Sequence, residues 1–425
     1  MKQSLKHGTI YLIAAQVSFV LSGYATHIGL GRFLGPSDYG IYAVVISLMT
    51  MVNLILSTGI PQAVSKYVAH GEGNELYVKR TAQKLQFSFS LILFILYYSL
   101  ADQLAIMLND PGMAPYLRLS SLIVPAYALQ ALYVGYFNGL KEYGKQSLMV
   151  ILYSTFKVVL ILGLALTPFA LYGAITGFII SSVAVLFLGF YFVHSADKRL
   201  RVSNNEHCMI SAKTLLGFAT PIVFYSVATN LIMSFDLFFV KAYLTDVDAG
   251  IYSAVSTISK VPFYIIAGIY GALFPAISSM SAHNDRSQIT LQIIRSVKYS
   301  MLILVPSTLF IVLFSRQVLS FLFSHQYSAG STALGVLTIG MGFFGLFSLF
   351  TTVINGSGQP RVSMLMSLFV LILDIVLNQL FIPLYGVVGA AMATCTACLL
   401  GLVVSFIYVY RKYNHSKEVS CFHAL

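Results

Sequence analysis

Four charged side chains lie inside long apolar segments of this 425-residue sequence, namely Lys157, Asp236, Lys260 and Asp374. An ionised group near the centre of a membrane helix costs at least about 2.5 to 3.5 kcal/mol on insertion scales, so such residues usually serve a function. A lysine at this depth can bind an anion, and an aspartate can bind a cation or a proton. These four residues are therefore candidates for handling a charged substrate and an ion within a bilayer.

The four charges allow two interpretations. In the first, they only neutralise one another inside the protein, for instance as an ion pair between Asp236 and Lys260 on adjacent helices. In the second, they line a hydrated cavity, where Lys157 and Lys260 bind an anionic substrate and Asp236 and Asp374 couple transport to an ion. The sequence alone leaves both interpretations open.

Two further cations, Arg32 and Lys241, stand at matching helix ends. Each precedes a polar connector, and the five residues from Asp38 to Tyr42 return in similar form from Asp248 to Tyr252, at an offset of 210 (248 minus 38). We expect Arg32 and Lys241 to receive an anionic headgroup nearer the outer face. The alternative is that they extend toward lipid phosphates.

Composition indicates a polytopic membrane protein. Hydrophobic residues make up 58% of the chain and charged residues 9%, and the mean hydropathy is +0.83, which is unlike a soluble protein of this length. A bilayer core about 30 Å thick needs roughly 20 apolar residues per helix. The sequence predicts twelve such segments: residues 8–31, 39–60, 83–101, 115–138, 146–167, 172–194, 213–241, 249–276, 297–314, 331–355, 362–383 and 386–410. The first is read as a signal anchor rather than a cleaved signal peptide.

The distribution of lysine and arginine supports twelve spans, because these residues gather in cytosolic loops. With the N-terminus inside, 19 of the 25 fall on the cytosolic side, four on the opposite side, and Lys157 and Lys260 within spans. Both termini are then cytosolic, in a cell membrane crossed many times. The net charge of +11 is explained by this excess of lysine and arginine on the cytosolic side, where these residues are attracted to anionic lipids of the inner leaflet. Nucleic acid is therefore not expected as a partner.

Matched landmarks indicate an internal duplication. Asn138-Gly139 closes the fourth predicted span as Asn355-Gly356 closes the tenth, at an offset of 217, which also relates Lys157 to Asp374. The predicted halves are residues 1–205 and 206–425, with six spans each. Because six is even, both halves enter the membrane from the same side, and substrate is expected between them.

No motif predicts an enzyme, a cofactor or a metal centre. The sequence contains no G-x-S-x-G, H-E-x-x-H or Walker loop, and its nine histidines form no pair at ligand spacing on one helix face. Cys395 and Cys398 form a C-x-x-C, which on an apolar helix is interpreted as packing. Catalytic chemistry and a bound metal are therefore not expected.

The residues from Gly31 to Tyr67, and those from Asn378 to Ala391, resemble the polysaccharide exporters of the multidrug/oligosaccharidyl-lipid/polysaccharide (MOP) superfamily. Asp236 and the following turn at Gly250-Ile251-Tyr252 are similar to the seventh helix of that family. The resemblance implies two six-helix lobes in a V, like the MATE transporters, and alternating access. The lipid II flippase branch usually has fourteen helices and several arginines in its first lobe, so the twelve spans and Arg32 found here depart from that branch.

The resemblance implies a flippase that moves a polyprenyl-diphosphate-linked oligosaccharide to the outer leaflet for surface polysaccharide synthesis. Its expected partners are this substrate, membrane lipids and a glycan polymerase or glycosyltransferases. Two alternatives remain: a cation-coupled exporter of drugs or other small molecules, and a scaffold for a glycan-assembly complex. A diphosphate requires lysine and arginine in the cavity, whereas organic cations require carboxylates and aromatic rings.

Overall fold

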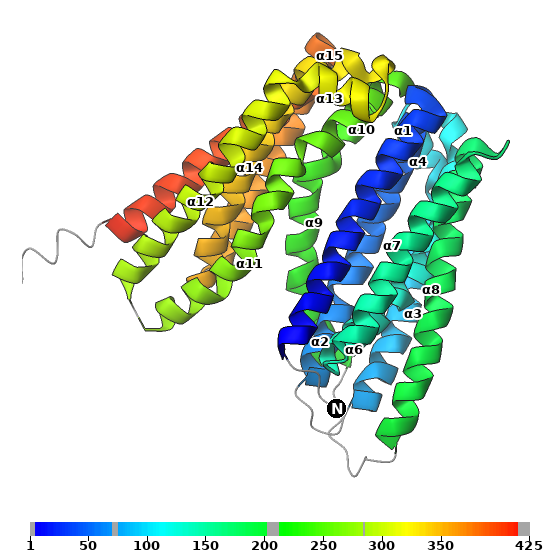
Figure 1. Ribbon diagram of the computed structural model, residues 1–425, viewed down its shortest axis with the longest axis vertical. Helices are drawn as coiled ribbons and strands as arrows, with labels where there is room; N and C mark the ends of the chain where they lie inside the picture. Colours follow the sequence, from blue (N-terminus) through cyan, green and yellow to red (C-terminus); the bar gives the residue numbers. More distant parts are fainter. Residues whose placement is uncertain (1–4, 70–74, 202–211, 284, 415–425) are drawn as a thin grey trace, which may run out of the picture. The chain divides into compact units, whose positions relative to one another are not determined.

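The computed structural model describes residues 5–69, 75–201, 212–283 and 285–414, and all regular secondary structure in these residues is helical (Figure 1). Lys2, Lys417, Cys208 and Cys421 lie outside the described residues. The helices are α1 (Leu5–Thr58), α2 (Ile60–Ala69), α3 (Glu75–Ser99), α4 (Ala101–Met107), η1 (Pro111–Met113), α5 (Ala114–Ser121), α6 (Ile123–Gly139), α7 (Tyr143–Ala165), α8 (Ala170–Arg201), α9 (Ala212–Tyr243), α10 (Asp246–Ser259), α11 (Val261–Ala282), α12 (Arg286–Leu313), α13 (Ser315–Leu322), η2 (His325–Gly330), α14 (Ser331–Gly356) and α15 (Pro360–Asn414).

The helices agree with the expected membrane spans. Within the described residues, eight segments are long and apolar enough to cross a bilayer, and α3 with α4, bent by 52°, forms a ninth. Two of the eight, Gly8–Ala69 and Pro360–Tyr413, have 62 and 54 residues, enough for two crossings of roughly 20 residues each. Each contains a glycine with non-helical backbone angles, so each is a pair of spans. The apolar 32-residue α9 is long enough for a further crossing.

The repeated connectors mark breaks in the helices. In α1 the break is at Gly35, whose φ of 73° and ψ of 176° are accessible to glycine and suit a residue that precedes Pro36. In the second half the chain leaves α9 and begins α10 after Thr245, whose Oγ1 accepts a hydrogen bond from the backbone N–H of Asp248 at 3.2 Å. The Asp248 carboxylate accepts in return from the Thr245 N–H, which completes a capping box. The two breaks are 210 residues apart (245 minus 35), the offset of the sequence repeat.

The described helices form two compact units, Met1–Asn230 and Leu231–Leu425, that divide within α9. The predicted boundary between residues 205 and 206 lies outside the described residues, so the halves expected from the sequence stay a prediction. In the first unit α7 packs against both α1 and α8, and α6 packs against α2 and α3 (Figure 1). In the second unit α14 packs against α11, α12 and α15.

Close packing inside each unit depends on small residues. A Cβ at Gly135 of α6 would lie 2.4 Å from the carbonyl oxygen of Pro61 in α2, and one at Gly356 of α14 would lie 3.0 Å from Ile277 in α11. The two contacts are at matching places in the repeat, at or just beyond the ends of the second and fourth predicted spans and of the eighth and tenth. Small residues allow such close approach where lipid supplies no hydrophobic drive for helix association.

Candidate functional site

Two buried carboxylates lie close to each other in the second unit. Asp236 on α9 and Asp374 on α15 are 1% and 0% exposed, and they are close enough for the charge of Asp236 to act on the Asp374 carboxyl group. The Asp236 carboxylate accepts hydrogen bonds from the Tyr252 hydroxyl, from the backbone N–H of Leu237 at 2.8 Å and from Thr394 Oγ1 at 3.3 Å. The structure therefore brings together the two residues that the sequence predicts for ion coupling.

The Asp374 carboxylate is less completely satisfied. Asn378, one helical turn later, donates from Nδ2 to Asp374 Oδ1 at 3.1 Å and to the Asp374 backbone oxygen at 2.9 Å. Asp374 Oδ2 and Asn378 Oδ1 are buried and have no hydrogen-bond partner. Buried acceptors without partners cost free energy, and a cation or a proton would satisfy them.

Four helical segments position this carboxylate cluster, which we define as Asp236, Tyr252, Asp374, Asn378 and Thr394. The aspartates come from α9 and from the part of α15 before Gly386, Tyr252 comes from α10, and Thr394 follows Gly386. All of the oxygen atoms are hard ligands, of the kind that bind hydrated cations and protons. Within the described residues, no group of three or more His, Cys, Asp or Glu side chains is placed to hold a metal ion.

Lys260 lies near this cluster, although not in direct contact with it. It is the partly buried residue that ends α10, and its charge acts on Asp236. In the described part of the chain, no carboxylate oxygen lies within 4 Å of its ammonium group. The simple ion pair considered for Asp236 and Lys260 is thus not formed in the described structure. Lys260 acts on Asp236 electrostatically, without direct contact.

Lys157 lies in the first unit, in a different environment. Its side chain on α7 is 8% exposed, and its Nζ lies 5.2 Å from the centre of the Phe19 ring. Among the described residues it forms no ion pair with a carboxylate. A buried ammonium that lies against an aromatic ring and forms no ion pair within the described residues can bind an anion.

The two outer cations differ from each other. Arg32 is exposed on α1, whereas Lys241 is 4% exposed and forms an ion pair with Asp246 at the start of α10. Their matching sequence positions therefore do not give matching environments. Arg32 lies at the protein surface, whereas Lys241 is paired with an aspartate of the connector that follows it.

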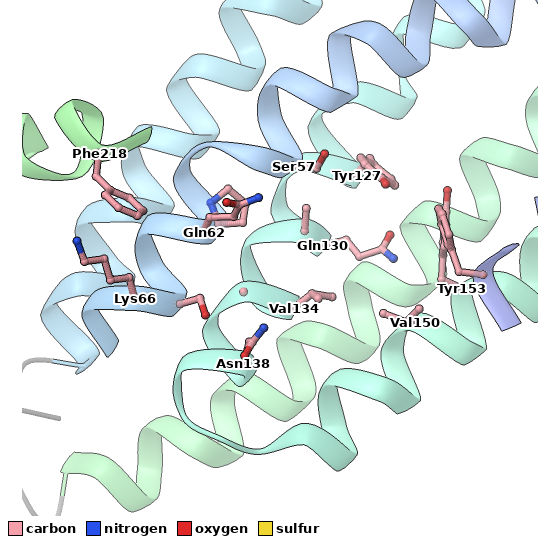
Figure 2. Close-up of a pocket in the computed structure, with 15 residues that line it drawn as sticks. Ser57, Gln62, Lys66, Tyr127, Gln130, Val134, Asn138, Val150, Tyr153 and Phe218 are labelled. Atoms are coloured by element: carbon pink, nitrogen blue, oxygen red, sulfur yellow. The ribbon is translucent and has the colours of Figure 1, made fainter. Parts of the chain in front are cut away.

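A pocket of about 490 Å³ opens in the first unit between α1, α2, α6, α7 and α9 (Figure 2). Its volume is in the range of roughly 300 to 1,000 Å³ that is usual for small-molecule sites. Figure 2 shows Gln62, Gln130 and Asn138 around one space, with Lys66 and Phe218 on one side and Tyr153 on the other. None of the fifteen lining residues is acidic. Phe19, which contacts Lys157, also lines this pocket.

Sequence reasoning missed several of these residues. It selected charged side chains, and therefore passed over Tyr252, Thr394 and Asn378 around the aspartates and Gln130 in the pocket. A carboxamide in an apolar span was the available signal for Asn378 and Gln130, because amides also need partners in lipid. No comparable signal marks a tyrosine or threonine, which are common in such spans.

A profile of the family described as polysaccharide biosynthesis protein matches residues 30–332, which is more than half of the chain. The chain belongs to this family. An uncharacterized membrane protein of Methanocaldococcus jannaschii is 23% identical to this family member over 425 residues, covering 97% of this chain and 99% of the relative. A putative O-antigen transporter of Shigella flexneri is 22% identical and covers 89% of this chain and 91% of its own length.

Solved structures of MOP superfamily transporters share the fold of this polysaccharide biosynthesis protein. An inward-facing multidrug resistance transporter of the MATE family aligns with a TM-score of 0.82 and 14% identity, covering 97% of this chain and 99% of that chain. The lipid II flippase MurJ aligns with a TM-score of 0.74 and 17% identity, covering 94% and 87%. The all-α polytopic fold and the resemblance to MOP exporters, both predicted from the sequence, are confirmed.

Proposed function

We propose that this protein is a flippase that moves a polyprenyl-diphosphate-linked oligosaccharide from the inner to the outer leaflet of the cytoplasmic membrane. The observation that carries the proposal is the buried Lys157, which has no carboxylate partner in the described structure, in a member of a polysaccharide biosynthesis family. A diphosphate cannot cross an apolar core unshielded, and an unpaired ammonium can accompany it. The relative from Shigella flexneri, named as a putative O-antigen transporter, supports the same class of cargo.

We further propose that the carboxylate cluster couples this movement to an ion, by alternating access. Asp236 and Asp374 are buried together, and the two acceptors without partners, Asp374 Oδ2 and Asn378 Oδ1, suit a proton or a small monovalent cation. A ligand drives a conformational equilibrium only as far as it binds the two states differently. The ion would therefore bind more tightly to the cluster in one of the two states of the transporter.

The remaining assignments are proposals of the same kind. Lys157 and Lys260 would contact the diphosphate within the bilayer, and Arg32 would receive it at the outer face. Lys241 is a weaker candidate for that role, because Asp246 already neutralises it. Both termini would lie in the cytosol, and a glycan polymerase or glycosyltransferases would act before and after the flipping step.

A cation-coupled exporter of small organic cations is the second candidate. Two buried carboxylates and the similarity of the fold to a multidrug resistance transporter favour it. The pocket of the first unit argues against it, because its lining contains one lysine and no acidic residue. An organic cation would find no counter-charge there.

Reconstituted protein distinguishes the two candidates. Proteoliposomes are loaded with a polyprenyl diphosphate that carries a fluorescent sugar, and dithionite added outside quenches the fluorophore in the outer leaflet. We expect quenching beyond the outer-leaflet fraction, accelerated by a proton or sodium gradient, and no extrusion of ethidium. Ethidium extrusion without movement of the sugar-lipid would favour the exporter. If the protein showed neither activity, the flippase proposal would be rejected.

A further inference from the structure

The pocket of the first unit has the chemistry of a carbohydrate site, and it takes no part in the ion coupling or diphosphate contacts proposed above. Its three carboxamides, Gln62, Gln130 and Asn138, come from α2 and α6 (Figure 2). Tyr127 and Tyr153 line the same space. Each carboxamide offers a donor and an acceptor, and each tyrosine offers a ring face and a hydroxyl group.

Gln130 provides the strongest observation. Its side chain is 4% exposed, lines the pocket, and has its Oε1 buried without a hydrogen-bond partner. Leaving such an acceptor unpaired is costly, and native structures rarely do so without a ligand or an ordered water. Gln130 therefore offers an acceptor that a hydrogen-bond donor, from a ligand or from an ordered water, would satisfy.

The packing of α6 against α2 fixes this arrangement. Gly135 lines the pocket and lies so close to the Pro61 backbone that no side chain fits between them. This contact holds Gln130 and Asn138 of α6 beside Gln62 of α2 at a constant spacing. A site built on two closely packed helices presents its hydrogen-bonding groups with little loss of entropy on binding.

We propose that this pocket binds the first sugar of the lipid-linked glycan, and that it does so by its hydroxyl or acetamido groups rather than by charge. The three carboxamides would pair with these groups, and Tyr127 or Tyr153 would pack against a ring face. Because no lining residue is acidic, neutral and anionic sugars are accepted and amino sugars with a free ammonium are disfavoured. This inference rests on the proposed flippase function, since it concerns the sugar portion of that cargo.

The position of the pocket fits loading from the inner leaflet. Lys66 at its edge belongs to the set of cations that the charge distribution places on the cytosolic side. Its ammonium lies 4.2 Å from the centre of the Phe218 ring, which holds the lysine beside the opening. A glycan assembled in the cytosol would meet this side of the first unit.

Binding to the full-length protein in lipid nanodiscs tests the proposal. The probes are tritiated farnesyl diphosphate and the same lipid carrying glucose, galactose or N-acetylglucosamine. We expect at least one sugar-bearing probe to bind about tenfold or more tightly than farnesyl diphosphate. Gln130→Leu should weaken the binding of that sugar-bearing probe by roughly three- to tenfold, the range for one lost hydrogen bond. It should leave the affinity for farnesyl diphosphate unchanged.

Asn138→Leu provides a second variant if Gln130→Leu folds poorly, and Gln103→Leu on α4, an exposed glutamine outside the pocket, is the matched control. Equal affinity of all four probes for the unmodified protein would overturn the proposal. So would an equal loss for bare and sugar-bearing probes in both pocket variants, which would make the pocket a diphosphate or lipid site. Flipping is measured separately: sugar-selective binding without flipping rejects the proposed function alone, and flipping without sugar selectivity rejects this inference alone.

Discussion

Asp236 is a buried carboxylate that is surrounded by hydrogen-bond donors and has no basic partner in the described structure. Its carboxylate is 1% exposed and receives three hydrogen bonds, from Tyr252, Leu237 and Thr394, yet no ammonium or guanidinium group contacts it in the described structure. A buried carboxylate with donors around it and a second carboxylate nearby requires a cation or a proton when the two are close. The ion coupling proposed above would use this requirement.

Replacing Asp236 with Asn tests ion coupling, because the amide oxygen still accepts hydrogen bonds while the charge is removed. We expect lipid-linked sugar to bind as before and the gradient-driven part of flipping to fall about tenfold or more, equivalent to about 1.4 kcal/mol. The assay compares proteoliposomes with and without proton and sodium gradients. Asp102→Asn is the control, since Asp102 forms an exposed ion pair with Arg118 at 2.5 Å. An unchanged response to both gradients would leave Asp236 as a structural partner only.

The positive charge of Lys157 is the feature that the proposed diphosphate contact requires. Lys157→Gln keeps hydrogen-bonding capacity and removes the positive charge, so we expect flipping to fall about tenfold while the amount of protein in the membrane stays near normal. Lys157→Arg should retain part of the activity, because guanidinium also binds phosphate. Complementation of a flippase-deficient strain provides the measurement.

The control for Lys157 is Lys145→Gln on the same helix, where the lysine is paired with Glu142 at 2.7 Å. Lys260→Gln is made in parallel, because Lys260 shares the proposed diphosphate role. Full complementation by both Lys157→Gln and Lys260→Gln would show that diphosphate binding does not depend on these cations. The lysines would then have no role in binding the substrate, and only the field of Lys260 at Asp236 would remain as a function for either of them.

At the scale of elements, the contact between α2 and α6 determines the shape of the pocket. Gly135→Ala would place a methyl group 2.4 Å from the Pro61 carbonyl oxygen, and because the obstacle is backbone, the helices must separate. Overpacking of this kind typically costs about 1 to 3 kcal/mol. We expect a lower melting temperature in detergent and weaker binding of sugar-bearing probes.

Gly163→Ala on α7 is the matched control, because nothing lies within 4 Å of the added methyl group. Its melting temperature should stay at or slightly above that of the unmodified protein, since alanine favours helix. If Gly135→Ala and Gly163→Ala were equally stable and bound the probes equally well, the α2–α6 contact would not determine the pocket.

For the molecule as a whole, the alternation of basic loops predicts the direction of insertion. In this prediction Gly112, between α4 and α5, lies outside the cell and His283, at the end of α11, lies in the cytosol. Both residues are exposed, so cysteines introduced there are open to reagents. We expect an impermeant maleimide to label Gly112→Cys in intact cells and His283→Cys only after permeabilisation.

The labelling is done in a background in which all four native cysteines are replaced, and the unsubstituted background is the blank. Labelling of His283→Cys in intact cells, with Gly112→Cys protected, would invert the proposed orientation. Labelling of both in intact cells would contradict the assignment of an odd number of spans between these two positions.

The fold class, the approximate spans and the position of the connectors could be predicted from the amino-acid sequence. In a bilayer every backbone polar group must be paired within the segment, so a long apolar run can only be a helix. The break at Gly35 and the capping box at Thr245 are local features, set by a glycine before a proline and by a threonine three residues before an aspartate. Such features depend on neighbours along the chain and can be read directly from it.

The contacts between side chains of different helices could not be predicted from the sequence. Tyr252 and Thr394 donate hydrogen bonds to Asp236, and Asp374 lies close to it, while Lys241, equivalent to Arg32 in sequence, is paired with Asp246. The physical reason is that lipid and the protein interior are similarly apolar, so hydropathy does not reveal which face of a span points inward. The pocket and the unpartnered Oε1 of Gln130 depend on that rotation and on the close approach of α2 and α6, and they become visible only when the helices are packed.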